Sequence, residues 1–164
     1  MTDIRKFALV HLRLLTDLLE DLREGEELEL QDNLFNVLFY ELMDSNEICV
    51  KLEISQIFVN LSHISDQFTE KLADLDFLHK IIQMTYCNCI QLIENLVIII
   101  GNIFFDADLE TSNYFTTHVP VVYRLKEMLQ NFNFEINSNL LNSILYCLNT
   151  VIIKTSVERF IIVH

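Results

Sequence analysis

The feature that most constrains the fold of this chain is an asparagine that recurs within three apolar segments. The segments are QIFVNLSHI (56–64), VIIIGNIFF (97–105) and LYCLNTVII (145–153). Their asparagines are Asn60, Asn102 and Asn149, so the gaps are 42 and 47 residues. A repeat of this length predicts a solenoid of stacked helices, in which each unit buries its apolar face against its neighbours. An amide at one helical phase then predicts a row of asparagines along one surface, which could hold the backbone of an extended peptide.

The composition is typical of long helices joined by short connections. The 164 residues include two Gly and one Pro, which argues against a β-sandwich because that fold needs many tight turns. The hydrophobic fraction is 51% and the charged fraction 21%, so the chain has ample apolar surface to bury and is not expected to be disordered. We therefore predict an all-α protein that forms one compact array.

The net charge of −13 limits the classes of partner. Direct nucleic-acid binding is not expected, because phosphate binding requires clustered Lys and Arg. A basic peptide or basic protein is the expected partner. Residues 17–29 hold seven acids and one base, and we interpret this run as a solvated face or loop.

No segment of the sequence is predicted to enter a membrane. The longest apolar stretch, residues 96–100, is interrupted by Gly101 and Asn102 and is too short to span a bilayer. The N-terminal apolar run is broken by His11 and Arg13, so no signal peptide is expected. These features predict a protein of the cytoplasm or nucleus, with its four cysteines reduced.

Apolar periodicity and helix breakers predict a leading helix within residues 1–24 and then three repeats. The repeats cover residues 31–63, 66–105 and 109–153, and residues 155–164 are expected to begin a further unit. The predicted helices are 4–23, 31–43, 47–63, 66–73, 75–85, 90–105, 109–117, 120–132 and 138–153. Ser45 is a candidate N-cap of the helix from residue 47, and Ser65 or Asp66 of the helix from residue 66, because such side-chain oxygens can accept from the first free amides of a helix.

The order short, medium and long within each complete repeat favours armadillo units over HEAT units, since a HEAT unit has two helices. The predicted fold is therefore an armadillo-like, right-handed α-solenoid of about three repeats. The chain ends in the apolar sequence RFIIVH, where a solenoid usually has a polar cap. We expect this end to pack on a partner or another copy, or to continue into a longer protein.

The residues around the asparagines resemble importin-α, an armadillo adaptor that carries nuclear-localisation signals. The third helix of its repeats has a Trp–Ala–Leu–Gly/Thr–Asn–Ile–Ala core. The segment IENLVIIIGNIFFD (93–106) matches that pattern, and the segments around Asn60 and Asn149 match it more loosely. The residues in register are Glu94, Gly101, Asn102, Ile103 and Asp106. The resemblance covers about residues 31–164.

This resemblance implies a concave groove lined by the third helices, which holds an extended basic peptide. It implies that Asn60, Asn102 and Asn149 bond the peptide backbone. Asp106, helped by Thr69, would receive the side chain of a lysine. The resemblance also identifies three wall positions, where importin-α has tryptophans that pack on basic side chains. The wall positions here are Gln56, Ile98 and Leu145.

The sequence departs from the family at sites that matter for affinity. Each aromatic wall contributes on the order of 0.5–2 kcal/mol through cation–π contact, so loss of all three predicts weaker binding. Ile64 stands where the family has a small glycine. The basic segment that binds importin-β is absent from residues 1–30, which are acidic. We therefore do not expect a complete import adaptor.

Simpler roles are open for the same residues. The asparagines could bridge neighbouring helices inside the stack, because buried amides require hydrogen-bond partners. Asp106 could lie in a solvated loop with Asp108 and Glu110.

The sequence gives no indication of catalysis, a metal or a cofactor. The cysteines lack the paired spacing of a structural zinc site, and the five histidines are scattered. With Gly25 and Gly101 as the glycines, a phosphate-binding loop is excluded. The cysteines are Cys49, Cys87, Cys89 and Cys147. We expect a non-enzymatic protein-recognition module. The alternative is a structural subunit, in which a degenerate armadillo array packs into a larger assembly or self-associates through its apolar ends.

Overall fold

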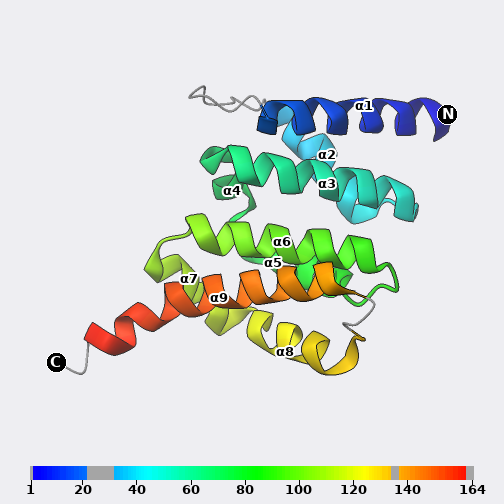
Figure 1. The fold of residues 1–164 in the computed structure, drawn as a ribbon. Coiled ribbons are helices and arrows are strands. Elements are labelled where there is room, and N and C mark those ends of the chain that lie inside the picture. Colours follow the sequence, from blue (N-terminus) through cyan, green and yellow to red (C-terminus); the bar gives the residue numbers. More distant parts are fainter. Residues whose placement is uncertain (1, 22–31, 134–136, 162–164) are drawn as a thin grey trace. The chain divides into compact units, whose positions relative to one another are not determined.

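The computed structural model describes residues 2–21, 32–133 and 137–161, and all regular structure within them is helical (Figure 1). The predicted all-α class is therefore confirmed. The helices are α1 (Thr2–Asp21), α2 (Asp32–Asp44), α3 (Ile48–Ile64), α4 (Asp66–Leu72), α5 (Leu75–Met84), α6 (Ile90–Asp106), α7 (Leu109–His118), α8 (Val121–Asn131) and α9 (Ser138–Ile161). Among these described helices, none combines the length and the apolar character that crossing a membrane requires.

The ends of the first eight helices agree with the predicted ends to within two residues. The ninth differs, because the short separate helix predicted from residue 155 does not form and α9 continues through Ile161. No Gly or Pro interrupts this stretch, and the Thr155 hydroxyl donates to the carbonyl of Val151 at 2.7 Å. The polar side chain is therefore satisfied within the helix and does not end it. Residues 162–164 of the predicted unit, and most of the acidic run, lie outside the described residues.

Side-chain caps explain several of the helix starts. The Ser65 hydroxyl accepts from the amide of Phe68 at 3.3 Å, so the predicted cap of α4 is confirmed. Asp74 and Asp108 cap α5 and α7 in the same way, each by accepting an amide hydrogen three residues later. The predicted cap of α3 is wrong, because the N-cap is Glu47, which makes no side-chain cap bond, and the Ser45 hydroxyl accepts instead from the amide of Glu47 itself.

The chain divides into two compact units, Met1–Thr69 and Glu70–His164. In unit 1, α1 and α3 pack side by side and run in the same direction, and α2 packs against α3 (Figure 1). Three aromatic rings from α2, α3 and α4 meet in this unit. The ring of Phe58 lies 5.1 Å from that of Phe68 and 6.2 Å from that of Phe35, measured between centroids. The Phe58–Phe68 contact is edge-to-face and the Phe58–Phe35 contact is stacked, and such oriented contacts favour one arrangement of the three helices over others.

In unit 2, the central element is α6, and α9 packs along it in the same direction (Figure 1). Nearly every apolar side chain of α6 from Leu92 to Phe104 is buried. A helix that is apolar over most of its circumference must be covered on several sides, which explains its central place. Helix α5 packs on α6, whereas α7 and α8 pack on α9.

Gly101 determines how closely α9 approaches α6. A Cβ atom at this position would lie 2.5 Å from Cε1 and 2.9 Å from Cδ1 of Tyr146, and 3.5 Å from the Cα of Cys147. The first two distances are shorter than any normal contact, so a side chain here would displace the Tyr146 ring. The glycine in the middle of α6 is therefore required by helix packing rather than by backbone conformation.

A buried arginine attaches α8 to the C-terminal end of α5. The Arg124 guanidinium donates to the hydroxyl of Thr85 at 2.8 Å, to the carbonyl of Thr85 at 2.6 Å and to Glu127 at 2.8 Å. Its carbon lies 3.7 Å from the centroid of the Tyr86 ring. The hydrogen bond from Arg124 lowers the pKa of the Glu127 carboxyl. Each of the three guanidinium nitrogens donates a hydrogen bond, which offsets part of the cost of burying the charge.

Gly101→Ala is expected to destabilise unit 2 by about 1–2 kcal/mol through overpacking against Tyr146, although Ala alone favours helix by about 0.5–1 kcal/mol. In a Tyr146→Ala background the clash is absent, so the same change at residue 101 should be neutral or stabilising. Urea denaturation of the four proteins in this cycle measures the difference. An equal loss of stability in both backgrounds would contradict this account of Gly101.

Candidate functional site

The eight predicted site residues divide between the two units, and each unit is considered by itself. Unit 1 contains Asn60, Gln56 and Thr69. Unit 2 contains Asn102, Asn149, Asp106, Ile98 and Leu145.

In unit 1, Asn60 is buried and its amide links α3 to α1. Its Nδ2 donates to the hydroxyl of Thr16 at 2.9 Å and to the carboxylate of Asp17 at 2.6 Å. Its Oδ1 accepts from Gln56, one of the wall positions, at 3.1 Å. An amide nitrogen carries two hydrogens, and both are donated within unit 1. A peptide could therefore accept a hydrogen bond from the Asn60 nitrogen only if the bond to Thr16 or to Asp17 were broken.

The Asn60 amide belongs to a larger polar network between α1 and α3. Arg13 donates to Asp17 and to Glu53, each at 2.8 Å. Asp17 thus accepts from both Arg13 and Asn60 and connects the ion pairs to the amide. A half-buried network of this kind fixes the register of two helices, because a slip would leave several polar groups unpaired. For Asn60 these contacts favour the bridging interpretation.

Thr69 lies near the end of unit 1 and is also buried. Its hydroxyl donates to the carbonyl of Asp66 at 2.8 Å, within the first turns of α4. This bond is one that a helix residue makes to its own backbone.

In unit 2, Asn102 lies on α6 beside Tyr146 of α9. The Tyr146 hydroxyl donates to Oδ1 of Asn102 at 2.9 Å, and the Asn102 side chain is 7% exposed. Burial raises the pKa of the Tyr146 phenol, and the charge of the Asp106 carboxylate contributes in the same direction. Asn102, Asp106 and Tyr146 therefore share one neighbourhood.

Asn149 is exposed on α9, at the level of Asn102 along the paired helices. The register follows from Lys154, whose Nζ donates to the carbonyl of Ala107 at 3.1 Å across 47 residues. Asn149 follows Asn102 by the same 47 residues, and the two helices run in the same direction. Of the two wall positions in this unit, Leu145 is exposed and Ile98 is half-buried. The structure thus brings Asn102 and Asp106 together beside Tyr146, and it places Asn149 and Leu145 at exposed positions on the neighbouring helix α9.

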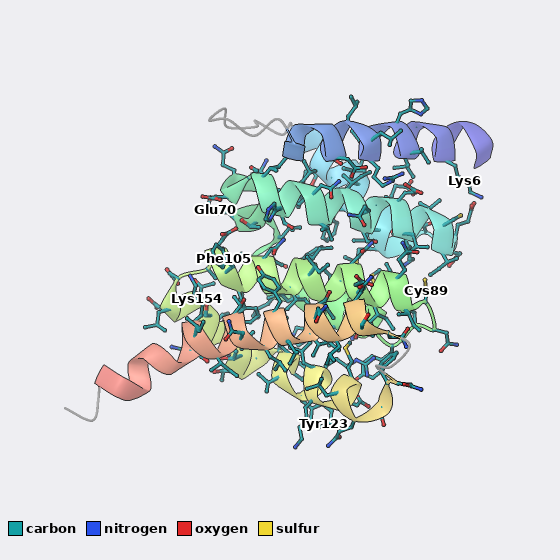
Figure 2. All side chains as sticks on the ribbon, in the orientation of Figure 1. Lys6, Glu70, Cys89, Phe105, Tyr123 and Lys154 are labelled. Atoms are coloured by element: carbon teal, nitrogen blue, oxygen red, sulfur yellow. The ribbon has the colours of Figure 1, made fainter. Side chains whose placement is uncertain are left out.

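Asp106 is exposed at the C-terminal end of α6, where the backbone carbonyls give the helix its negative pole. The last turn of α6 contains no basic residue. A cation reaches this end from α9 instead, because the Lys154 ammonium bonds to Ala107 and lies 5.8 Å from the centroid of the Phe105 ring. Figure 2 shows the labelled Phe105 and Lys154 at the same end of the α6–α9 pair.

Three residues of this neighbourhood were not predicted, namely Tyr146, Phe105 and Lys154. Tyr146 follows the wall position Leu145 by one residue, so its aromatic ring lies beside a wall position rather than at one. Phe105 is 61% exposed and immediately precedes Asp106. The 47-residue gap between Asn102 and Asn149 is a signal that pairs Lys154 with Ala107 and could have identified this contact from the sequence.

The cysteines and histidines form no candidate metal centre within the described residues, where no three ligand-type side chains converge. The four thiols are free, and full burial raises the pKa of Cys147 to about 12. Cys147 therefore remains protonated and unreactive at neutral pH, as expected for a packing residue beside Gly101.

Comparisons of the chain with protein-family models, with curated proteins and with solved structures return no match.

Asn60→Ala is expected to destabilise unit 1 by about 1–3 kcal/mol, because it removes two donors from the α1–α3 network and leaves Asp17 under-satisfied. Backbone amides of α1 should then exchange with deuterium faster than in the parent protein. Exposed Asn36→Ala on α2 is the matched control and should leave α1 unchanged. Unaltered exchange in α1 of the Asn60 variant would show that the amide does not hold the two helices together.

Proposed function

We propose that this chain is a non-catalytic protein-recognition module with an armadillo-like α-solenoid fold, related in design to importin-α. It binds an extended basic peptide on the α6–α9 face, by the exposed edges of its long third helices. The observation that carries the proposal is that Asn102 and Asp106 of α6 share one neighbourhood with Tyr146 of α9, the helix on which Asn149 is exposed. Aromatic surface from Tyr146 and Phe105 lies beside them.

The helix arrangement supports an armadillo-like design. Each unit contains a pair of long helices that pack side by side in the same direction, α1 with α3 and α6 with α9 (Figure 1). Two shorter helices precede α6, namely α4 with 7 residues and α5 with 10, and two precede α9, namely α7 with 10 and α8 with 11. Parallel long helices separated by shorter ones are what a stack of three-helix repeats requires.

The chemistry of the α6–α9 face supports an extended basic ligand. Asn149 is an exposed amide, which can donate to a peptide carbonyl and accept from a peptide amide. Asp106 adds a carboxylate at the negative pole of α6, and the whole chain carries a charge of −13. A basic side chain at this end would therefore meet favourable electrostatics from the residue, the helix and the protein.

Aromatic contacts are also present on this face, although the three wall positions are not aromatic. Phe105 and Tyr146 are both exposed and belong to the two helices that form the face. Either ring can pack on the stem of a lysine or arginine, and cation–π contact at exposed sites is worth about 0.5–1 kcal/mol. In this proposal they replace part of the energy that the missing tryptophans would have supplied.

A fluorescein-labelled Lys/Arg-rich peptide is expected to bind the full chain with an affinity that falls as salt rises. Asp106→Asn should weaken binding about tenfold, because it removes a charge that pairs with the ligand. Asn149→Ala should weaken it about fivefold through loss of backbone hydrogen bonds. Fluorescence anisotropy measures each affinity.

The matched controls are Asp76→Asn on α5 and Asn88→Ala in the α5–α6 connection, both at exposed positions. They repeat the same chemical changes and should leave binding unchanged. A peptide of the same length with Gln in place of every Lys and Arg should not bind. Absence of binding by the basic peptide, or equal losses in the site and control variants, would refute the proposed site.

A second function is favoured by the apolar surface of α9. Leu145, Tyr146, Ile152 and Ile153 recur at helical spacing and are between 40% and 56% exposed. Exposed apolar residues that recur on one side of a helix, here on either side of Asn149, are typical of a surface that packs on another protein. Together with a mean hydropathy of +0.30, this surface favours a structural subunit in which a degenerate armadillo array joins a larger assembly.

The structural alternative predicts concentration-dependent self-association of the purified chain. Multi-angle light scattering should show species larger than the monomer, and Ile152→Asp with Ile153→Asp should restore the monomer by placing charge on this surface. Exposed Val122→Asp on α8 is the control. A monomer at all accessible concentrations would count against an assembly surface on α9.

A further inference from the structure

The C-terminal end of α6 already holds an ammonium group. Lys154 extends from α9, donates to the carbonyl of Ala107 at 3.1 Å and lies over the ring of Phe105 at 5.8 Å. Ala107 is the C-cap of α6, so Lys154 supplies the positive charge that the last turn of the helix lacks. Lys154 therefore makes, within the protein, the contact that a lysine of a basic ligand would make at the C-terminal end of α6.

The positive charge of Lys154 acts on an acidic residue near the C-terminal end of α6. Asp108 follows Ala107 and caps α7. The pKa of Asp108 is lowered mainly by the hydrogen bond from the Thr111 amide, and the charge of Lys154 acts in the same direction. Asp106, the predicted receiver of a ligand lysine, precedes Ala107 by one residue. A ligand ammonium that approached Asp106 would thus meet the positive charge of Lys154.

We propose that Lys154 is an internal competitor of the basic ligand, which must displace the Lys154 ammonium from the C-terminal end of α6. This inference rests on the proposed peptide-binding function and adds a regulatory element to the same site. Two effects act together. The ligand loses a carbonyl acceptor and part of the Phe105 ring to Lys154, and the two ammonium groups repel each other.

The displacement requires little rearrangement. Lys154 lies on a flexible four-carbon stem, is half-buried and can swing to solvent without moving the backbone of α9. The competition therefore sets affinity through a side-chain rotation rather than through a change in helix packing. Removing the charge while keeping the stem should leave the fold intact and make the site more accessible to a basic ligand.

Lys154→Met is the decisive variant, because methionine keeps a flexible apolar side chain beside Phe105 and loses the ammonium. The labelled Lys/Arg-rich peptide is expected to bind it about three- to tenfold more tightly than it binds the parent protein. Lys154→Arg keeps the charge and should bind like the parent. Lys126→Met, at an exposed position on α8, lowers the net charge equally and controls for the overall field. Thermal melting of each variant establishes that it is folded.

The outcomes separate the two proposals. Tighter binding by Lys154→Met, with parent-like binding by Lys154→Arg and Lys126→Met, supports internal competition. Unchanged or weaker binding by folded Lys154→Met, while the parent binds the peptide, overturns the competition and leaves the proposed function standing. An equal gain in Lys126→Met also overturns it, since the effect would then be one of net charge. If neither the parent nor Lys154→Met binds, the proposed function fails and the inference fails with it.

Discussion

The close approach of α9 to α6 is the constraint on which the structure of unit 2 depends. Helix α6 is apolar over most of its circumference, so it is stable only when other helices cover it. Gly101 permits α9 to cover it closely, because any side chain at that position would meet Tyr146. The same contact orients Tyr146 toward Asn102 and sets the register that brings Lys154 to Ala107. The pairing of α6 with α9 thus determines both how unit 2 packs and which side chains lie on the exposed α6–α9 face.

The three asparagines show how one repeated residue acquires different roles. Asn60 donates both amide hydrogens to α1, so its capacity is used inside unit 1. Asn102 is nearly covered and accepts from Tyr146, whereas Asn149 is exposed. The asparagines differ in role because different side chains of the neighbouring long helix lie opposite them. Helix α1 presents Thr16 and Asp17 to the first asparagine, and α9 presents a tyrosine to the second. In the proposed function, the exposed amide and Asp106 carry most of the recognition.

The helix boundaries could be predicted because local signals determine them. Ser65, Asp74 and Asp108 are capping residues that satisfy free amides at helix starts, and such bonds depend on residues three apart in the chain. The end of α9 was missed because Thr155 bonds back to its own helix. The candidate site was only partly predictable. The resemblance to importin-α led to the prediction of Asn102, Asn149 and Asp106 as one set, but Tyr146, Phe105 and Lys154 lie near it through contacts across 44 to 49 residues.

The sequence by itself determined the all-α class, the position of nearly every helix and the residues that share a helical phase. These properties follow from apolar periodicity, caps and breakers, which act over one or two turns. The tertiary structure alone decided which polar groups are already bonded. Hydrogen-bond satisfaction depends on the side chain opposite, and that partner comes from a helix some 40 residues away. For this reason a row of identical asparagines in the sequence became one buried bridge, one held amide and one exposed amide in the fold.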